Sequence, residues 1–244
     1  MSITTAELIA YGSLNRPQDD VATSGGAPDF QNRPVFTQLV ANSTLVYTSN
    51  AADTRQVTTR GRDSTGAIVN ETISLNGTTP VSGAQVFERI LTVQVASSGS
   101  QVVTIGGAGN SSLGQIPASE IGFYCMFINS ASDPAVGKTR YEKIFWKNTD
   151  AALTLTSATI QLSADPSSKI TIGLTVALND STSVANRLAA PAGVSFVGVG
   201  VSQNVVGNQL AAGSEQGVWI LQTLNAGDAA LKSTFTTQLA GNTV

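Results

Sequence analysis

The sequence contains no histidine, so the commonest general base and the commonest metal ligand of proteins are both absent. Without histidine the chain cannot form a Ser-His or Cys-His dyad, which excludes most hydrolase mechanisms. No serine stands three residues before a lysine, and the run SDPAVGKT lacks the first glycine of a phosphate-binding loop because Ser132 takes its place. The glycine-rich run at 106–114 also misses the dinucleotide fingerprint. We therefore expect a protein that is not an enzyme, with no cofactor and no metal.

The chain has a single cysteine, Cys125, and no apolar run near the roughly 18 residues of a membrane span. One cysteine cannot form a disulfide within the chain, and its neighbours in GFYCMFI predict a small buried hydrophobic residue rather than a reactive thiol. The first residues, MSITTAELIAYG, lack the basic leader and the long apolar segment of a signal peptide. The sequence thus predicts no secretion signal and no contact with a membrane.

Charge is scarce, because only 12% of the residues are charged and the formal net charge is -3. Serine, threonine, asparagine, glutamine and glycine take the polar positions, so we expect a neutral surface rich in hydroxyl groups. No block of lysine and arginine exists that could follow a phosphate backbone. The composition therefore excludes nucleic acid from the expected partners.

A few acidic and aromatic residues remain as candidates for chemistry. Three glutamates lie within apolar strand patterns: Glu71, Glu88 and Glu142. Strand alternation favours solvent-facing positions for them over a pair of catalytic carboxylates. Asp19, Asp20 and Asp29 do not have the spacing of a known calcium loop. A sugar-binding platform would have to use Tyr47, Trp146 or Trp219, but both tryptophans lie in apolar strand patterns that favour core packing.

Alternating apolar residues are abundant, and they predict antiparallel strands. In LKSTFTTQL the residues Leu231, Phe235 and Leu239 share one face, and KITIGL and GVWILQTL show the same period of two. In ALTLTSATIQL the apolar positions change from odd to even, which predicts a β-bulge near Ser157. Turn signals separate these runs at 74–80, 162–169, 190–194 and 224–228. The expected fold is all-β, with antiparallel β-sandwich or jelly-roll-like modules.

The distribution of the strand patterns predicts three parts. An extended N-terminal arm covers 1–34, a first β module covers 35–118, and a second β-sandwich module covers 119–244; the glycine-rich run GGAGNSSLGQIPAS is the expected joint. A single large sandwich is the alternative. Because the arm is poor in apolar residues, we expect it to order against a partner chain, and the alternative is that it packs on its own module. The candidate partner-binding residues of the arm are Arg16, Pro17, Asp19, Asp20, Asp29 and Arg33.

Four segments of the chain resemble virion structural proteins of tailed bacteriophages. They are DTRQVTTRGRDSTGAIVNETISLNGTTPVSGAQVFERILTV, RYEKIFWKNTDAALTLTSATIQLSADPSSKITIGL, APAGVSF and LAAGSEQGVWILQTLNAGDAA. Within that group the resemblance favours a capsid cement or decoration protein. It implies binding to the major capsid protein, assembly into a homo-oligomer with a trimer favoured over a dimer, and a place on the capsid exterior after synthesis in the host cytoplasm. The resemblance carries over no functional residue. The alternatives are a tail, fibre or baseplate component and a carbohydrate-binding β-sandwich.

Overall fold

The computed structural model describes residues 2–107, 112–128, 136–228 and 233–243, and these residues form an almost entirely β protein. The helical segments among them are two single 3-10 turns, η1 (Thr5–Glu7) and η2 (Val206–Asn208). Nearly all strand pairs are antiparallel; the exception is the short pair of β3 (Asn32–Arg33) with β11 (Gly122–Tyr124). The all-β, antiparallel expectation is confirmed.

The chain folds into two compact units, and the second is inserted into the first. Unit 1 contains Met1–Asp29 and Met126–Val244, and unit 2 contains Phe30–Cys125. These limits differ from the expected boundaries at 34 and 118. The glycine-rich run does not join two modules, because within it β10 (Ser112–Ile116) pairs with β9 (Val103–Gly107) and makes a hairpin of unit 2. The part of that run at 108–111 lies outside the described residues.

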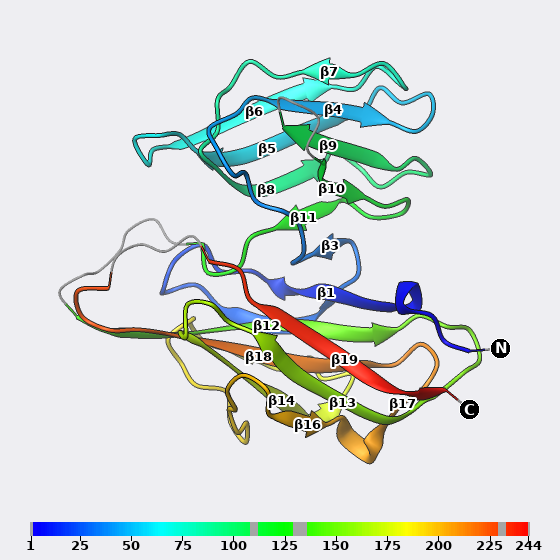
Figure 1. The fold of residues 1–244 in the computed structure, drawn as a ribbon, viewed down its shortest axis with the longest axis vertical. Coiled ribbons are helices and arrows are strands. Elements are labelled where there is room, and N and C mark those ends of the chain that lie inside the picture. Colours follow the sequence, from blue (N-terminus) through cyan, green and yellow to red (C-terminus); the bar gives the residue numbers. More distant parts are fainter. Residues whose placement is uncertain (1, 108–111, 129–135, 229–232, 244) are drawn as a thin grey trace. The chain divides into compact units, whose positions relative to one another are not determined.

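Unit 1 is a sandwich of two sheets (Figure 1). The larger sheet has the order β14-β18-β12-β1-β2-β15, and its strands are β1 (Leu8–Asn15), β2 (Ser24–Asp29), β12 (Lys138–Asn148), β14 (Ile170–Leu178), β15 (Ser183–Val184) and β18 (Glu215–Leu224). In the smaller sheet β13 (Leu155–Ala164) pairs with β16 (Ser202–Asn204), β17 (Gln209–Leu210) and β19 (Thr236–Thr243). One apolar core contains Ile144, Ile172 and Ile220 of the larger sheet and Ile160 and Leu239 of the smaller.

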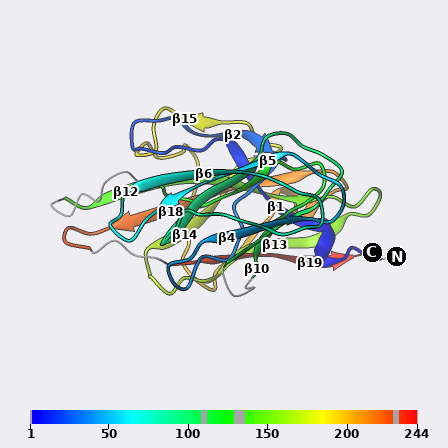
Figure 2. The same cartoon turned by 90° about the horizontal axis from the view of Figure 1, so that it is seen from above.

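The N-terminal segment is part of the larger sheet and does not extend as an arm. Strand β1 lies between β12 and β2, so its backbone groups are paired on both sides, and Ala10 and Tyr11 are buried. Figure 2 shows β2 with β15 beside it at the end of this sheet. Gly25 of β2 has φ +87°, and a Cβ atom there would lie 2.6 Å from Cη2 of Trp219. A residue without a Cβ is needed for this conformation and this close approach. The backbone pairing of β1 on both sides and the burial of Ala10 and Tyr11 hold this apolar-poor segment in the fold.

Several strand predictions are confirmed in unit 1. The runs KITIGL and GVWILQTL form most of β14 and β18. The bulge predicted near Ser157 is present, because the register of β13 on β19 shifts between Thr156 and Thr159 and Ser157 has φ 49°. Strand β19 begins at Thr236, later than the predicted alternation, and Leu231 lies outside the described residues.

Unit 2 also consists of two sheets, with the orders β10-β9-β4-β7 and β3-β11-β8-β5-β6. The remaining strands are β4 (Leu45–Ser49), β5 (Gln56–Arg62), β6 (Ile68–Ser74), β7 (Val81–Ser82) and β8 (Arg89–Val95). Its own apolar core includes Phe87, Ile90 and Phe123. The buried Tyr47 hydroxyl forms a hydrogen bond with Thr59 Oγ1 at 2.8 Å. Each unit therefore has a separate core.

Candidate functional site

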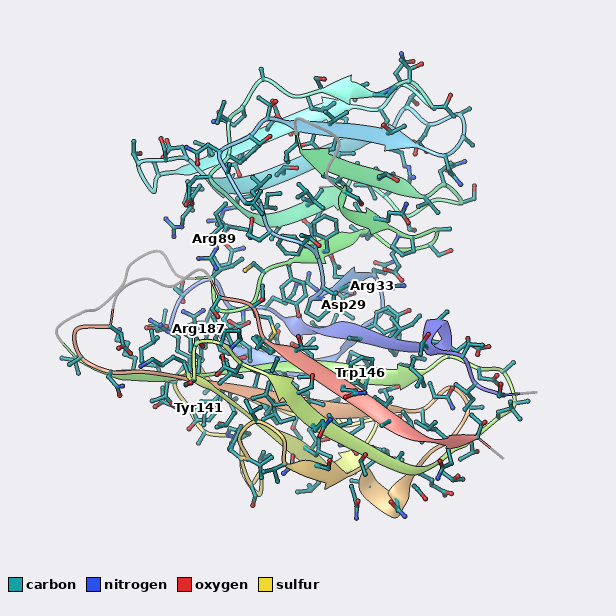
Figure 3. The ribbon with its side chains drawn as sticks, viewed as in Figure 1. Asp29, Arg33, Arg89, Tyr141, Trp146 and Arg187 are labelled. Atoms are coloured by element: carbon teal, nitrogen blue, oxygen red, sulfur yellow. The ribbon has the colours of Figure 1, made fainter. Side chains whose placement is uncertain are left out.

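Unit 1 contains a group of five charged side chains that are largely removed from solvent; we call it the charge cluster. Its members are Asp20, Lys138, Arg140, Glu142 and Arg187. Three of them occupy alternate positions of β12 and therefore share a face of the strand. Asp20 comes from the segment between β1 and β2, and Arg187 follows β15 (Figure 3). The side chains of Arg140 and Arg187 are only 2% and 0% exposed.

Asp20 joins the three cations of the cluster. Its carboxylate accepts hydrogen bonds from Arg140 Nε at 2.6 Å, Arg187 Nη2 at 2.6 Å and Lys138 Nζ at 3.0 Å. Burial by itself would raise the pKa of Asp20, but the hydrogen bonds from these three side chains hold that pKa well below its usual range. Asp20 is therefore ionised at neutral pH and fastens its segment to β12.

Glu142 is the buried acid of the cluster. Its Oε1 accepts hydrogen bonds from the Phe127 backbone N–H at 3.0 Å and from Arg187 Nη1 at 3.3 Å. Burial raises the pKa of Glu142 to about 7, although the charge of Arg187 opposes this shift. The expectation that Glu142 faces solvent is wrong. Strand alternation separates two faces but does not say which face is wet, and in β12 the even positions also include the core residue Ile144.

The chemistry open to the charge cluster is limited, because its groups satisfy one another. Arg187 also donates from Nη1 to the Ile128 carbonyl at 2.6 Å, so its guanidinium bonds to three different residues. Within the described part of the chain, no three acidic, cysteine or histidine residues are arranged to hold a metal ion. The arrangement fits a structural fastening inside unit 1.

A second buried cation, Lys143, lies on the other face of β12. Its Nζ donates to Asp180 Oδ1 at 2.6 Å and to the Thr182 carbonyl at 2.8 Å, and it lies 4.9 Å and 5.4 Å from the ring centroids of Phe145 and Trp219. Burial lowers the pKa of Lys143, and the charge of Asp180 opposes that change. The side chain is 0% exposed, so it has no open path to a substrate.

The candidate residues of the expected arm have partners within the chain. Arg16 pairs with Asp29, Asp19 Oδ1 accepts from the Ala22 backbone N–H at 2.9 Å, and Asp20 belongs to the charge cluster. In unit 2, Arg33 Nε donates to Glu120 Oε2 at 2.7 Å. Pro17 is buried. Arg33 belongs to unit 2 and the other five residues to unit 1. Contact of these residues with a partner chain stays a prediction.

The basic members of the charge cluster were not among the residues predicted from the sequence to form a site. The signal was present in KTRYEK, where Lys138, Arg140 and Glu142 alternate with other residues along a strand. Such alternation of charges on one face indicates either a wet face or a buried ion network. The apolar residues that follow on the same face, Ile144 and Trp146, favour the network.

Two other residues considered for chemistry lie in unit 2. Cys125, expected to be buried, is only partly buried, and Arg89 Nη2 donates to its Sγ at 3.7 Å. Glu71 of β6 accepts backbone N–H groups of Ala84 and Gln85 through Oε1, at 2.6 and 2.8 Å. Glu71 therefore has a local role in holding that loop.

The three aromatic candidates for sugar binding differ in exposure. Tyr47 and Trp219 are buried, at 0% and 1% exposure. Trp146 is partly buried and lines an open groove of about 270 Å³, which we call the Trp146 groove. The residues that line it are Thr5, Leu8, Trp146, Ser163, Thr236, Thr237, Gln238 and Leu239. Trp146 Nε1 donates to Thr237 Oγ1 at 3.2 Å, which holds the indole in place (Figure 3).

None of the helical turns in the described residues has the length and apolar character needed to cross a membrane. No family model matches the chain, and comparisons with curated proteins and with solved structures found no match.

Proposed function

We propose that this protein is a non-enzymatic structural component of a phage particle, and that it acts as a capsid cement or decoration protein that binds across subunits of the major capsid protein. The four segments that resemble virion structural proteins support this proposal, and so does the two-unit β architecture. A β protein of this kind stabilises a shell through contacts that symmetry repeats many times, so each single contact can be weak.

The observation that carries the proposal is how the protein uses its charge. At least nine of the 13 lysines and arginines form an ion pair inside the chain. Three of them, Arg140, Lys143 and Arg187, are almost fully buried. The charge left for the surface is therefore small, and a neutral surface limits repulsion between identical copies on a shell.

The test is binding to particles of the phage that encodes the chain, with heads and tails separated. We expect the purified protein to sediment with heads that lack it, in a fixed ratio to capsid subunits, and not with tails. A particle reconstruction should then show its density on the outside of the head. Density confined to the tail would instead support a tail, fibre or baseplate component and contradict the cement role.

The oligomeric state requires a separate measurement. We propose a closed homo-oligomer, with a trimer as the favoured state. Light scattering coupled to size exclusion should then give three times the chain mass of 25.1 kDa. A mass of 25.1 kDa in solution, together with isolated single copies of the protein on the shell, would contradict the homo-oligomer. It would not contradict binding to the head.

The absence of catalysis is also testable. We expect no turnover of generic ester, glycoside and phosphate substrates. The variant Glu142→Gln is the control, because burial raises the pKa of Glu142 to about 7, within the range of a general acid. Turnover that this variant abolished would refute the proposal of a non-enzymatic protein.

A further inference from the structure

The Trp146 groove combines one aromatic residue with many uncharged polar groups. Five of its eight lining residues carry a hydroxyl or an amide: Thr5, Ser163, Thr236, Thr237 and Gln238. The others are Leu8, Trp146 and Leu239, so none of the eight described lining residues is charged. Aromatic rings bind the apolar C–H face of a sugar, while hydroxyl and amide groups pair with its hydroxyls. This composition suits a ligand that is polar and neutral.

Strands β13 and β19 form one side of the groove. Four consecutive residues of β19 line the groove: Thr236, Thr237, Gln238 and Leu239. Ser163 of β13 also lines the groove, at the point where the register of β13 on β19 shifts between Leu162 and Ala164. Strand β13 is the partner of β19 among the described residues.

The lining residues are fixed before any ligand binds. Trp146 bonds to Thr237 Oγ1 at 3.2 Å, Ser163 Oγ donates to the Thr236 carbonyl at 3.1 Å, and Gln238 Oε1 accepts from Gln161 at 3.0 Å. A site whose side chains are already held loses less conformational entropy on binding.

The size of the groove selects among neutral ligands. A volume of about 270 Å³ lies just below the ~300–1,000 Å³ of sites for drug-sized molecules. A peptide strand added to β19 would need a longer border, because strands commonly run about 5–6 residues, and the groove borders four. One or two sugar rings fit these dimensions better than a strand.

We propose that the Trp146 groove is a binding site for a neutral saccharide of one or two pyranose units. The C–H face of a ring stacks on the Trp146 indole, and the ring hydroxyls pair with Thr5, Ser163 and Gln238. The site goes beyond the structural role proposed above and does not depend on it. It adds contact with a surface glycan to a protein that binds a shell.

The test is a titration with glucose, galactose, mannose, N-acetylglucosamine and maltose, followed by tryptophan fluorescence and by saturation-transfer NMR. The chain has two tryptophans, so Trp146→Phe leaves only the buried Trp219 as a fluorophore. This variant therefore shows which part of the fluorescence change comes from Trp146. We expect at least one of these sugars to change the wild-type fluorescence, and Trp146→Ala to weaken its binding about tenfold, or ~1.4 kcal/mol. Glucuronate, a pyranose with a carboxylate, is the matched ligand and should bind more weakly.

A second variant protects the test against loss of folding. Ser163 is exposed, so Ser163→Leu fills the groove and leaves the core residues in place. It should abolish binding while the protein still unfolds in one cooperative thermal transition. The proposal is overturned if none of the neutral sugars gives a signal at millimolar concentration. It is equally overturned if Trp146→Ala and Ser163→Leu both bind as the wild type does, or if the groove takes a peptide strand and no sugar.

Discussion

Replacing Asp20 by asparagine should destabilise unit 1 strongly. The change removes the single negative charge that Arg140, Arg187 and Lys138 share, while the side chain keeps its size. Arg140 and Arg187 would then stay buried, with Glu142 as the remaining acid. Removing one partner of a buried ion pair costs about 3–5 kcal/mol. Because the Asp20 side chain is 15% exposed and water reaches part of it, we expect about 3 kcal/mol.

The measurement is urea unfolding at neutral pH, followed by tryptophan fluorescence. Trp146 and Trp219 both belong to unit 1, so the signal reports the unfolding of that unit. The matched control is Asp19→Asn, the same chemical change one residue earlier. Asp19 is exposed and caps its own loop, and asparagine can keep that bond, so we expect a loss below about 0.5 kcal/mol. Equal losses in the two variants would refute the reasoning.

Three further predictions follow from the same structure. Burial raises the pKa of Glu142 to about 7 from 4.5, so its contribution to stability is complete below pH 4.5 and is lost as pH rises through 7. We expect the free energy of unfolding to be about 3 kcal/mol lower at pH 8. In urea unfolding at several pH values, Glu142→Gln should make this dependence on pH weaker. Gly25→Ala places a Cβ 2.6 Å from Trp219 at φ +87° and should cost about 1–3 kcal/mol in thermal unfolding; an unchanged midpoint would contradict it. Phe30–Cys125, expressed alone, should unfold cooperatively by circular dichroism, because it has its own core around Phe87; a chain without a transition would show that it depends on unit 1.

The strand predictions that succeeded depend on local pattern. In β14 every second residue from Ile170 is apolar, and in β13 the shift of that pattern placed the bulge at Ser157. Both signals come from side chains that must alternate between a core and a wet face, so they are visible within about ten residues.

The predictions that failed depend on partners distant in sequence. Strand β1 pairs Tyr11 with Phe145, and the segment after it is held by Asp20 through Arg140 and Arg187. No local pattern near residue 20 shows that these cations lie opposite. The segment was therefore predicted to order against a partner chain, and the structure shows that partners in the same chain order it. Contact with a partner chain stays a prediction. The polar groove around Trp146 was missed for the same reason, because its lining comes from residue 5, from β12 and from β19.

The insertion of unit 2 sets an order of events during synthesis. All of Phe30–Cys125 leaves the ribosome before β12 does. The edge of β1 that pairs with β12 can form its hydrogen bonds only after Lys138–Asn148 has been synthesised. At about 5–20 residues per second, the interval between β1 and β12 is on the order of 10 s, long enough for a small β domain to fold. We therefore expect nascent chains stalled after unit 2 to hold this unit in a protease-resistant form, with residues 8–29 still cleavable. Protection of residues 8–29 in those chains would contradict this order.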